Sequence, residues 1–246
     1  MQLQEQIISA INTTLKNPIY QTMQLLNIKS ILKSANFVKK REGVNPYLVV
    51  LHFVYMLVMN KKISTFMNQS NDSLKKDTYY RLLQNSSYNW RKLLSLTNLK
   101  ILKLLHKVQD SSSVKVLIID DTVEGKTGKY VEGSRDALWS NKEKRNIRGI
   151  NVVSLNYSDG YSNFMLDFAI SMGNYARVKF EEFTQELDVR TTAYKRRLEI
   201  MDGKSKIAID MIVRALKSGI YADYLLVDSW YSKPAFLKEM NTLGLK

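Results

Sequence analysis

Hydrophobic and polar positions follow different periods in the two halves of the chain. In the first half, apolar residues recur at helical spacing. This pattern predicts helices over residues 20–40, 47–67, 79–83 and 88–107, after a first helical segment that starts near Leu3. Few glycines and prolines interrupt these segments, so the first half is predicted to be all helical.

In the second half, short β-branched apolar runs replace the helical spacing after a polar break at residues 110–113. The predicted strands are 114–119, 149–157, 161–171 and 224–227. The predicted helices are 179–187, 191–201, 204–217 and a last one that begins with Ser232-Lys233-Pro234. A strand meander followed by alternating helices and strands is typical of an α/β fold with a mixed sheet. We therefore expect a helical region, 1–110, and an α/β domain, 111–246.

Charge is distributed as unevenly as the hydrophobic pattern. The net charge is +14, and residues 1–110 hold 16 Lys and Arg against 5 Asp and Glu, a net charge of +11. A concentrated basic field suits a nucleic acid, because each neutralised phosphate releases condensed counterions. A basic surface that only keeps the protein dissolved is the alternative. Residues 111–246 carry only +3, so we expect the polyanion contacts in the first half.

The sequence shows no cysteines, no signal-peptide pattern and no stretch long enough to span a membrane, and these absences bear on the cellular compartment. There are no cysteines, so disulfides, zinc–thiolate sites and thiol nucleophiles are excluded. The N-terminus has no basic segment followed by an apolar run, as a signal peptide would. The most apolar stretch, 46–59, is shorter than the roughly 18 residues needed to span a bilayer. We expect a cytoplasmic protein with no membrane contact.

Carboxylates follow two of the predicted strands. Asp120 and Asp121 come after Val116 to Ile119, and Asp228 comes after Leu225 to Val227. Strand ends form the crevice of an open α/β sheet, where carboxylates brought together can hold divalent cations. Two Mg²⁺ ions in such a site can activate a nucleophile and stabilise the leaving oxygen of a phosphodiester. Asp that only caps a turn after a strand is the alternative.

Cations and aromatic residues alternate before the predicted boundary. They lie in two helical segments joined by a short polar turn, and this arrangement is compatible with a helix-turn-helix. The alternative is ordinary helix packing, with Tyr80 and Trp90 in the core. The candidate DNA-contacting residues are Lys75, Lys76, Tyr79, Arg81, Arg91 and Lys92.

Several of these motifs, in this order, resemble the DDE transposases of bacterial insertion sequences, which have an RNase H-like catalytic domain. The segment Ile118-Ile119-Asp120-Asp121-Thr122, with Lys126 to Lys129 and Glu132-Gly133 after it, looks like the first catalytic strand. Residues 149–153 resemble the next strand, and Leu225 to Tyr231 resemble the second catalytic Asp with its aromatic follower. Residues 78–83 and 89–91 look like the preceding helical region.

The resemblance, closest to the insertion-sequence-4-like group, implies that Asp121 and Asp228 are catalytic and are the first two metal ligands. Asp120 is the alternate first ligand; Asp121 is preferred because it directly precedes Thr122. The family's third ligand is a Glu on a later helix, and Glu239 follows Asp228 too closely to match it. The resemblance thus implies a C-terminally truncated chain with an incomplete RNase H-like domain, whose complete form uses two Mg²⁺ ions.

Three functions follow from these observations. The first is a DNA transposase that hydrolyses phosphodiesters at double-stranded insertion-sequence ends and joins them to target DNA, as a homodimer on DNA, with this chain a fragment inactive alone. The second is a non-catalytic truncated transposase that binds DNA and competes with the full-length enzyme. The third is an RNase H-like nuclease unrelated to mobility.

Overall fold

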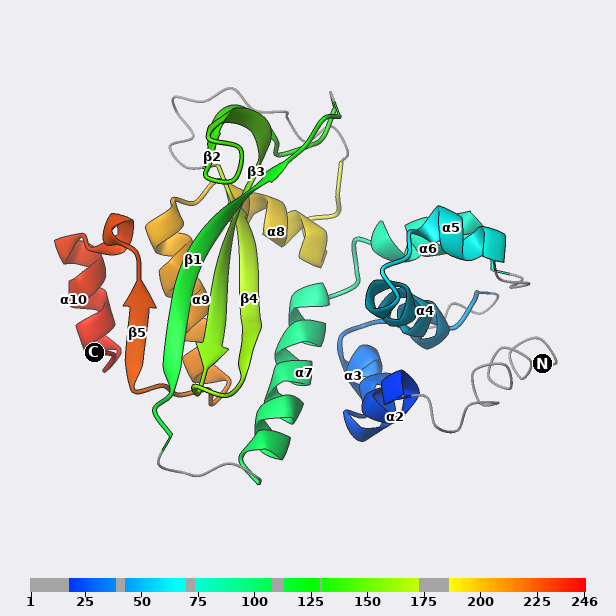
Figure 1. Ribbon diagram of the computed structural model, residues 1–246, viewed down its shortest axis with the longest axis horizontal. Helices are drawn as coiled ribbons and strands as arrows, with labels where there is room; N and C mark the ends of the chain where they lie inside the picture. The colour runs from blue at the N-terminus through cyan, green and yellow to red at the C-terminus, as the bar shows by residue number, and fades with distance from the viewer. Residues whose placement is uncertain (1–17, 39–42, 70–73, 108–112, 129, 173–185) are drawn as a thin grey trace. The chain divides into compact units, whose positions relative to one another are not determined.

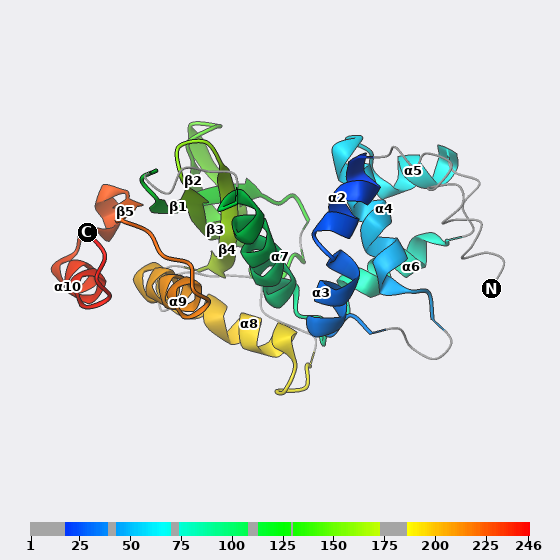
Figure 2. The ribbon, with the colours of Figure 1, turned by 90° about the horizontal axis from the view of Figure 1, so that it is seen from below.

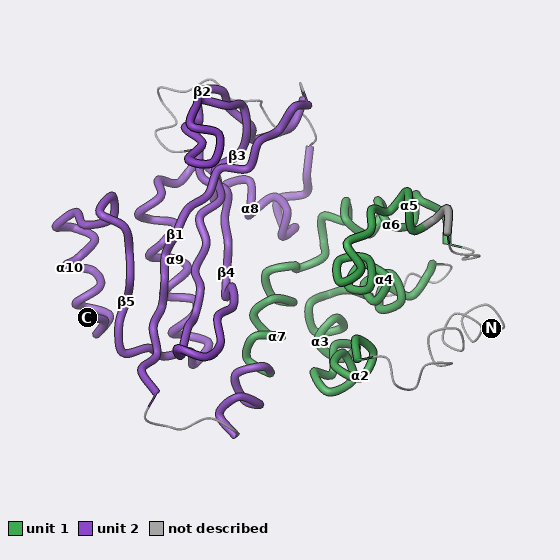
Figure 3. Tube along the Cα trace, in the orientation of Figure 1, with its two compact units in different colours: residues 1–100 green, residues 101–246 purple. Residues whose placement is uncertain are grey.

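A computed structural model of the chain describes residues 18–38, 43–69, 74–107, 113–128, 130–172 and 186–246 (Figure 1). The chain divides into two compact units, residues 1–100 and residues 101–246 (Figure 3). The division falls within a helix, whereas the sequence suggested the polar segment after that helix. The predicted segment starting near Leu3 lies outside the described residues.

The first unit is helical, as its apolar spacing predicts. Its helices are α2 (Pro18–Leu25), α3 (Ile28–Ser34), α4 (Pro46–Val58), α5 (Ile63–Gln69), α6 (Lys76–Leu83) and the larger part of α7 (Trp90–Leu105). Two predicted helices are each split in two, at Asn27 (φ 54°) and Asn60 (φ 50°). Asparagine tolerates this left-handed backbone better than other non-glycine residues, so each helix stops there without large strain.

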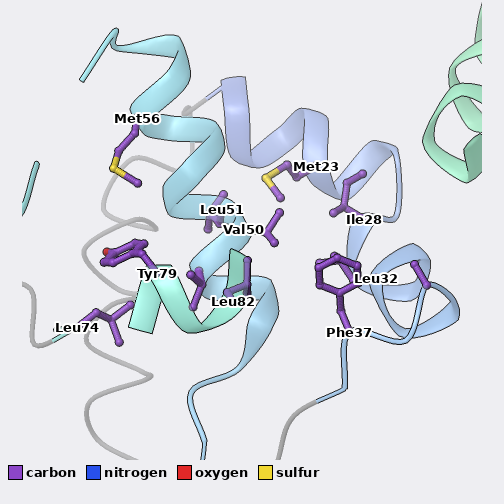
Figure 4. Packing of buried hydrophobic residues seen from close by; sticks show 12 residues of the cluster. Met23, Ile28, Leu32, Phe37, Val50, Leu51, Met56, Leu74, Tyr79 and Leu82 are labelled. Atoms are coloured by element: carbon purple, nitrogen blue, oxygen red, sulfur yellow. The ribbon is translucent and has the colours of Figure 1, made fainter. Parts of the chain in front are cut away.

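The core of this unit gathers apolar side chains from α2, α3, α4 and α6 (Figure 4). It contains Met23, Leu32, Val50, Met56, Tyr79 and Leu82. α4 begins with Pro46 after the capping Asn45, whose side chain accepts a hydrogen bond from the Tyr47 amide, and it is buried as predicted. None of the helices in the described ranges is long and apolar enough to cross a membrane.

The second unit is built on a five-stranded sheet. The strands are β1 (Val116–Gly125), β2 (Arg135–Ser140), β3 (Arg145–Ser158), β4 (Asn163–Ser171) and β5 (Tyr224–Val227). Their order is β2-β3-β1-β5, and β4 also pairs with β3. β1 is antiparallel to β3 and parallel to β5, which confirms the predicted α/β fold with a mixed sheet. β2 was not predicted, because its residues lack a clean alternation of apolar and polar positions.

Two helices lie on one face of the sheet, α8 (Thr192–Ile200) and α9 (Lys204–Lys217) (Figure 2). Both match the predicted segments 191–201 and 204–217. α9 contacts β3 and β4, and it buries Ile207, Ala208, Met211 and Ile212. The predicted helix at 179–187 lies almost entirely outside the described residues.

After β5 the chain makes a short turn, η2 (Ser229–Tyr231), and then the helix α10 (Pro234–Thr242). The last residues return to β5, where the Leu225 amide donates a hydrogen bond to the Lys246 carbonyl at 3.0 Å. The register of β1 with β5 places Ile119 beside Val227, so the short strand β5 ends level with the middle of β1. The predicted end of the first strand at Ile119 is wrong: pairing with β3 continues β1 to Gly125, so Asp120 and Asp121 lie within the strand and only Asp228 follows one.

Candidate active site beside two parallel strands

Side chains alternate along β1, and this alternation separates its two acidic residues. Leu117 and Ile119 are buried on the face that packs against the helices. Asp121 continues that face, and its pairing partner on β3 is the buried Val153. Asp120 points to the opposite, exposed face, where its Oδ1 accepts a hydrogen bond from the Asp121 amide at 2.8 Å. Consecutive residues of a strand face opposite ways, so only Asp121 lies over the helix-covered face.

Asp228 directly follows β5 and caps the turn η2. Its Oδ1 accepts a hydrogen bond from the Trp230 amide at 2.8 Å. This cap turns the chain sharply, so that Tyr231 is completely buried while Trp230 remains 42% exposed. The capping role offered as an alternative for a strand-end Asp is therefore real, but it engages only one of the two carboxylate oxygens.

The Tyr231 hydroxyl lies among the acidic residues. It is buried, and none of the described residues makes a hydrogen bond with it. Burial, together with the negative charges of Asp121, Asp228 and Asp120, raises the pKa of Tyr231 far above its ordinary value. The hydroxyl therefore stays protonated, and it lies within electrostatic reach of Asp121 on β1 and Asp228 after β5, although these residues are distant in sequence.

Asp121 has two hydrogen-bond donors on one oxygen. Its Oδ2 accepts from the Lys204 ammonium at 2.7 Å and from the Asn151 amide nitrogen at 3.0 Å. The side chains of Lys204 and Asp121 are only 16% and 17% exposed. Lys204 is the first residue of α9, and Asn151 lies on β3. Sequence reasoning missed both residues, because a lysine at a helix start and an asparagine in a strand carry no signal until pairing places them beside Asp121.

Trp230 extends the site towards solvent. The Lys204 ammonium lies 5.3 Å from the centre of the Trp230 ring, and the Lys233 ammonium lies 3.9 Å from it. Cations over an indole face are attracted by the negative charge of the ring. Two positive side chains thus border the acidic site, on the side where Trp230 is exposed.

The donor set is of the kind that a hard divalent cation prefers. Carboxylate oxygens and an amide carbonyl are oxygen ligands suited to Mg²⁺. Asp121 Oδ1 and Asp228 Oδ2 accept no hydrogen bond from the described residues, and the buried Asn151 Oδ1 lacks a partner there as well. The residues therefore fit a divalent cation, with oxygen lone pairs still open towards it.

The acidic set is nevertheless small. Across the described ranges, no group of three or more His, Cys, Asp or Glu side chains is arranged to hold a metal ion. Asp120 faces away from Asp121, and Glu239 is exposed on α10. Asp121 and Asp228, together with Asp120, are thus the acidic residues whose charges act on the Tyr231 hydroxyl.

The candidate DNA-contacting residues of α6 and α7 are divided by burial. Lys75, Lys76, Arg81 and Lys92 are exposed, and Arg91 is half-buried. Tyr79 has to be removed from the set: its side chain is completely buried, and its hydroxyl lies 2.9 Å from His52 Nδ1. The helical period turns Tyr79 inward, so its neighbour Tyr80 is the exposed aromatic, with Lys76 5.6 Å from its ring centre.

The segment that joins α6 to α7 packs as part of the helical core. Tyr88 stacks on Phe37 with ring centres 4.4 Å apart, and Trp90 meets Phe37 edge-on at 4.8 Å. These contacts agree with ordinary helix packing for the aromatic residues of this segment. The exposed cations of the two helices remain the candidates for phosphate contacts.

A family model described as DDE superfamily endonuclease matches residues 61–246 of the chain. The match spans Asp121, Asn151, Lys204 and Asp228, and enzymes of this superfamily generally use divalent metals and act on DNA. No curated protein matches the chain. The mixed sheet, the acidic residues beside its parallel strands and this match, which covers most of the chain, lead to one conclusion: the chain belongs to the DDE superfamily endonuclease family.

Proposed function

We propose that this protein is a DNA transposase of the insertion-sequence-4-like group, whose site hydrolyses phosphodiesters at the ends of an insertion sequence and transfers the resulting 3′-hydroxyl to target DNA. One observation carries the proposal. Asp121 lies within β1, close to the level at which the parallel strand β5 ends, and Asp228 directly follows β5; the charges of both carboxylates raise the pKa of the Tyr231 hydroxyl. Carboxylates so placed can share cations beside a phosphate.

In this proposal Asp121 and Asp228 are the catalytic carboxylates and the ligands of Mg²⁺. Two bound Mg²⁺ ions supply activation of the attacking oxygen and stabilisation of the leaving oxygen. Asp121 would contribute Oδ1, because Lys204 and Asn151 occupy its Oδ2. Asp228 would contribute Oδ2, because the Trp230 amide occupies its Oδ1. Neutral donors such as the Asn151 amide and the Trp230 amide orient a ligating carboxylate, and such partners commonly support metal affinity.

Asp120 is the weaker candidate for the first ligand. The register of β1 with β5 brings Asp120 level with Asp228, since Ile119 lies beside Val227. Its side chain, however, projects from the exposed face of β1, whereas Asp121 and Tyr231 have buried surroundings. A dry environment strengthens electrostatic interactions with a metal and a phosphate, which favours Asp121.

The helical unit is proposed to bind double-stranded DNA. Residues 1–110 carry a net charge of +11, and the exposed cations on α6 and α7 are Lys75, Lys76, Arg81 and Lys92, with Arg91 half-buried beside them. Such side chains contact phosphates and hold the protein on the duplex without reading its sequence. A homodimer on DNA and a cytoplasmic location belong to the same proposal.

A non-catalytic role is the second candidate. The described residues group no third acidic side chain with Asp121 and Asp228, and two carboxylates hold metals more weakly than three. A transposase-like protein that binds element ends without cutting them would compete with an active transposase for the same DNA. This protein would keep the DNA affinity of the helical unit and lack cleavage.

Cleavage of a labelled duplex that carries the element ends distinguishes the two candidates. If the protein is a transposase, it cuts the duplex in a Mg²⁺-dependent reaction. Asp121→Asn and Asp228→Asn should then abolish cutting and leave the affinity for DNA unchanged. Asp120→Asn is the matched control, which should still cut. Asn at position 228 keeps the oxygen that caps the turn, so the fold is preserved. Binding without cutting by the unaltered protein would favour the competitor, and full cutting by both Asn variants would exclude the proposed ligands.

A further inference from the structure

The pair of Lys204 and Asp121 is the most buried contact between a lysine and a carboxylate at the site. The ammonium lies 2.7 Å from Asp121 Oδ2, and both side chains are more than four-fifths covered. A positive group at this distance in a sheltered environment interacts much more strongly than an exposed pair does. Lys204 therefore neutralises a carboxylate that the proposed function assigns to a divalent cation.

The helix holds the backbone of Lys204 in place. Lys204 directly follows Gly203 at the start of α9, and the next turns of α9 are anchored by Ile207, Ala208 and Met211, all 0% exposed. The first turn of a helix also carries a partial positive charge, which acts on Asp121 in the same direction as the ammonium. The buried residues of α9 thus fix the backbone of Lys204 beside Asp121, while its side chain can still move off the carboxylate.

The hydrogen bonds on Asp121 limit what else its carboxylate can accept. A carboxylate oxygen offers about two lone-pair directions. Lys204 and Asn151 fill both on Oδ2. A cation that needs Oδ2 has to displace one of these donors, and a cation on Oδ1 alone has to approach an ammonium of the same sign.

We propose that Lys204 is a positioning residue that takes the place of a cation at Asp121 in the metal-free protein and competes with the divalent metal for this carboxylate. The inference rests on the proposed function, because it takes Asp121 to be a metal ligand. Metal binding is then coupled to displacement of the Lys204 ammonium from Oδ2. The Lys204 ammonium keeps the Asp121 carboxylate oriented when no metal is bound. It also makes the protein bind metal more weakly than it would without this charge.

A second lysine on the same helix provides a matched control. Lys206 pairs with Asp202 at 2.6 Å and with Asp210 at 3.1 Å, and its side chain is 62% exposed. Lys206→Gln removes the same unit charge from α9 without touching Asp121. Lys204→Gln removes the charge at the site but keeps an amide donor for Asp121. Lys204→Arg keeps the charge.

Binding of Mn²⁺, measured by electron paramagnetic resonance of the free ion, tests the inference on the full chain. We expect Lys204→Gln to bind Mn²⁺ on the order of tenfold more tightly than the unaltered protein, because a like charge close to the ion is removed. Lys206→Gln and Lys204→Arg should stay within about twofold. Without metal, Lys204→Gln should melt at a lower temperature, and added Mn²⁺ should raise its melting temperature more than that of the unaltered protein.

The outcomes separate the inference from the proposed function. If Asp121→Asn and Asp228→Asn abolish Mn²⁺ binding but Lys204→Gln binds no more tightly than the unaltered protein, competition by Lys204 is excluded and the ligand assignment stands. If the Asn variants bind Mn²⁺ as well as the unaltered protein, both ideas fail. If Lys204→Gln binds none while the unaltered protein binds, competition by Lys204 is excluded, because the ammonium is then required for binding. Lys204→Met, which also removes the donor, should repeat the gain in affinity, and a Met variant that binds Mn²⁺ as weakly as the unaltered protein would count against competition by the Lys204 charge.

Discussion

Two completely buried tyrosines, one in each unit, have opposite surroundings. The hydroxyl of Tyr79 in the helical unit lies 2.9 Å from His52 Nδ1, inside a core of aliphatic and aromatic side chains. The hydroxyl of Tyr231 in the sheet unit has no hydrogen-bond partner in the part of the chain that the structure describes. Its neighbours are instead the charged residues Asp121 and Asp228.

The difference separates a residue that builds the fold from one that marks a site. A buried hydroxyl with a partner contributes to stability, whereas one without a partner costs about 1–3 kcal/mol. Such a cost is commonly tolerated where function uses the group. Tyr79 thus belongs to the core, whereas Tyr231 belongs to the proposed site. The predictions below test this contrast, from the largest expected effect to the smallest.

Removal of the Tyr79 ring should have the largest effect on stability. Tyr79→Ala deletes a completely buried aromatic side chain that also contacts Phe53 edge-on, with ring centres 5.6 Å apart. We expect a loss of about 3–5 kcal/mol in the free energy of unfolding of the helical unit, measured by urea denaturation. Tyr80→Ala, at an exposed neighbouring position, should lose less than about 1 kcal/mol. Similar losses for the two variants would contradict the placement of Tyr79 in the core.

Removal of the tyrosine hydroxyl alone should change the free energy of unfolding differently in the two units. Tyr79→Phe leaves His52 Nδ1 without the tyrosine hydroxyl, so we expect a loss of about 1–2 kcal/mol. Tyr231→Phe removes a hydroxyl without a partner, so we expect no loss or a gain of up to about 1 kcal/mol in the metal-free protein. Urea denaturation of both variants makes the comparison. A loss for Tyr231→Phe equal to that of Tyr79→Phe would show that the Tyr231 hydroxyl is bonded in solution.

Alkaline pH should enlarge the difference between Tyr231 and its Phe variant. Burial, then the nearby carboxylates, raise the pKa of Tyr231 from its ordinary value of 10.0 in the folded protein. The folded state therefore keeps the proton that the unfolded chain loses above about pH 10, so the contribution of Tyr231 is full below this pH and declines above it. The stability of Tyr231→Phe relative to the unaltered protein should rise from pH 9 to pH 11, by thermal melting. A constant difference across this range would contradict the charged surroundings of Tyr231.

The fold was largely predictable because its elements follow from local periodicity. The helices 204–217 and 191–201 and the strand 224–227 appear in the structure nearly as predicted. The predicted helices 20–40 and 47–67 are each broken at an asparagine with positive φ, which apolar spacing does not reveal. β2 escaped detection because polar residues occupy both of its faces.

Only the site residues that directly follow an apolar run could be predicted from the sequence. Asp120-Asp121 and Asp228 each follow an apolar run, and the parallel pairing of β1 with β5 places these runs side by side, although β1 itself continues to Gly125. Lys204 and Asn151 join them through helix and strand packing across long stretches of sequence, which no local pattern encodes. Tyr79 was misassigned because aromatic and basic residues near one another are typical both of DNA contacts and of a helix with one buried side. The exposed face of that helix gives the last test.

Arg81 lies on the same helix as Tyr79 but on the outside, so its replacement should affect DNA rather than stability. Its side chain is 82% exposed, and its ion pair with Asp77 is long, at 4.0 Å. Arg81→Ala should weaken binding of any duplex severalfold and reduce the slope of log affinity against log salt concentration by about 0.9, the loss of one phosphate contact. Fluorescence anisotropy at several salt concentrations measures both quantities. Tyr79→Phe should leave the salt slope unchanged. If Arg81→Ala and Tyr79→Phe change the slope equally, DNA binding depends on the folding of the helical unit rather than on its exposed cations.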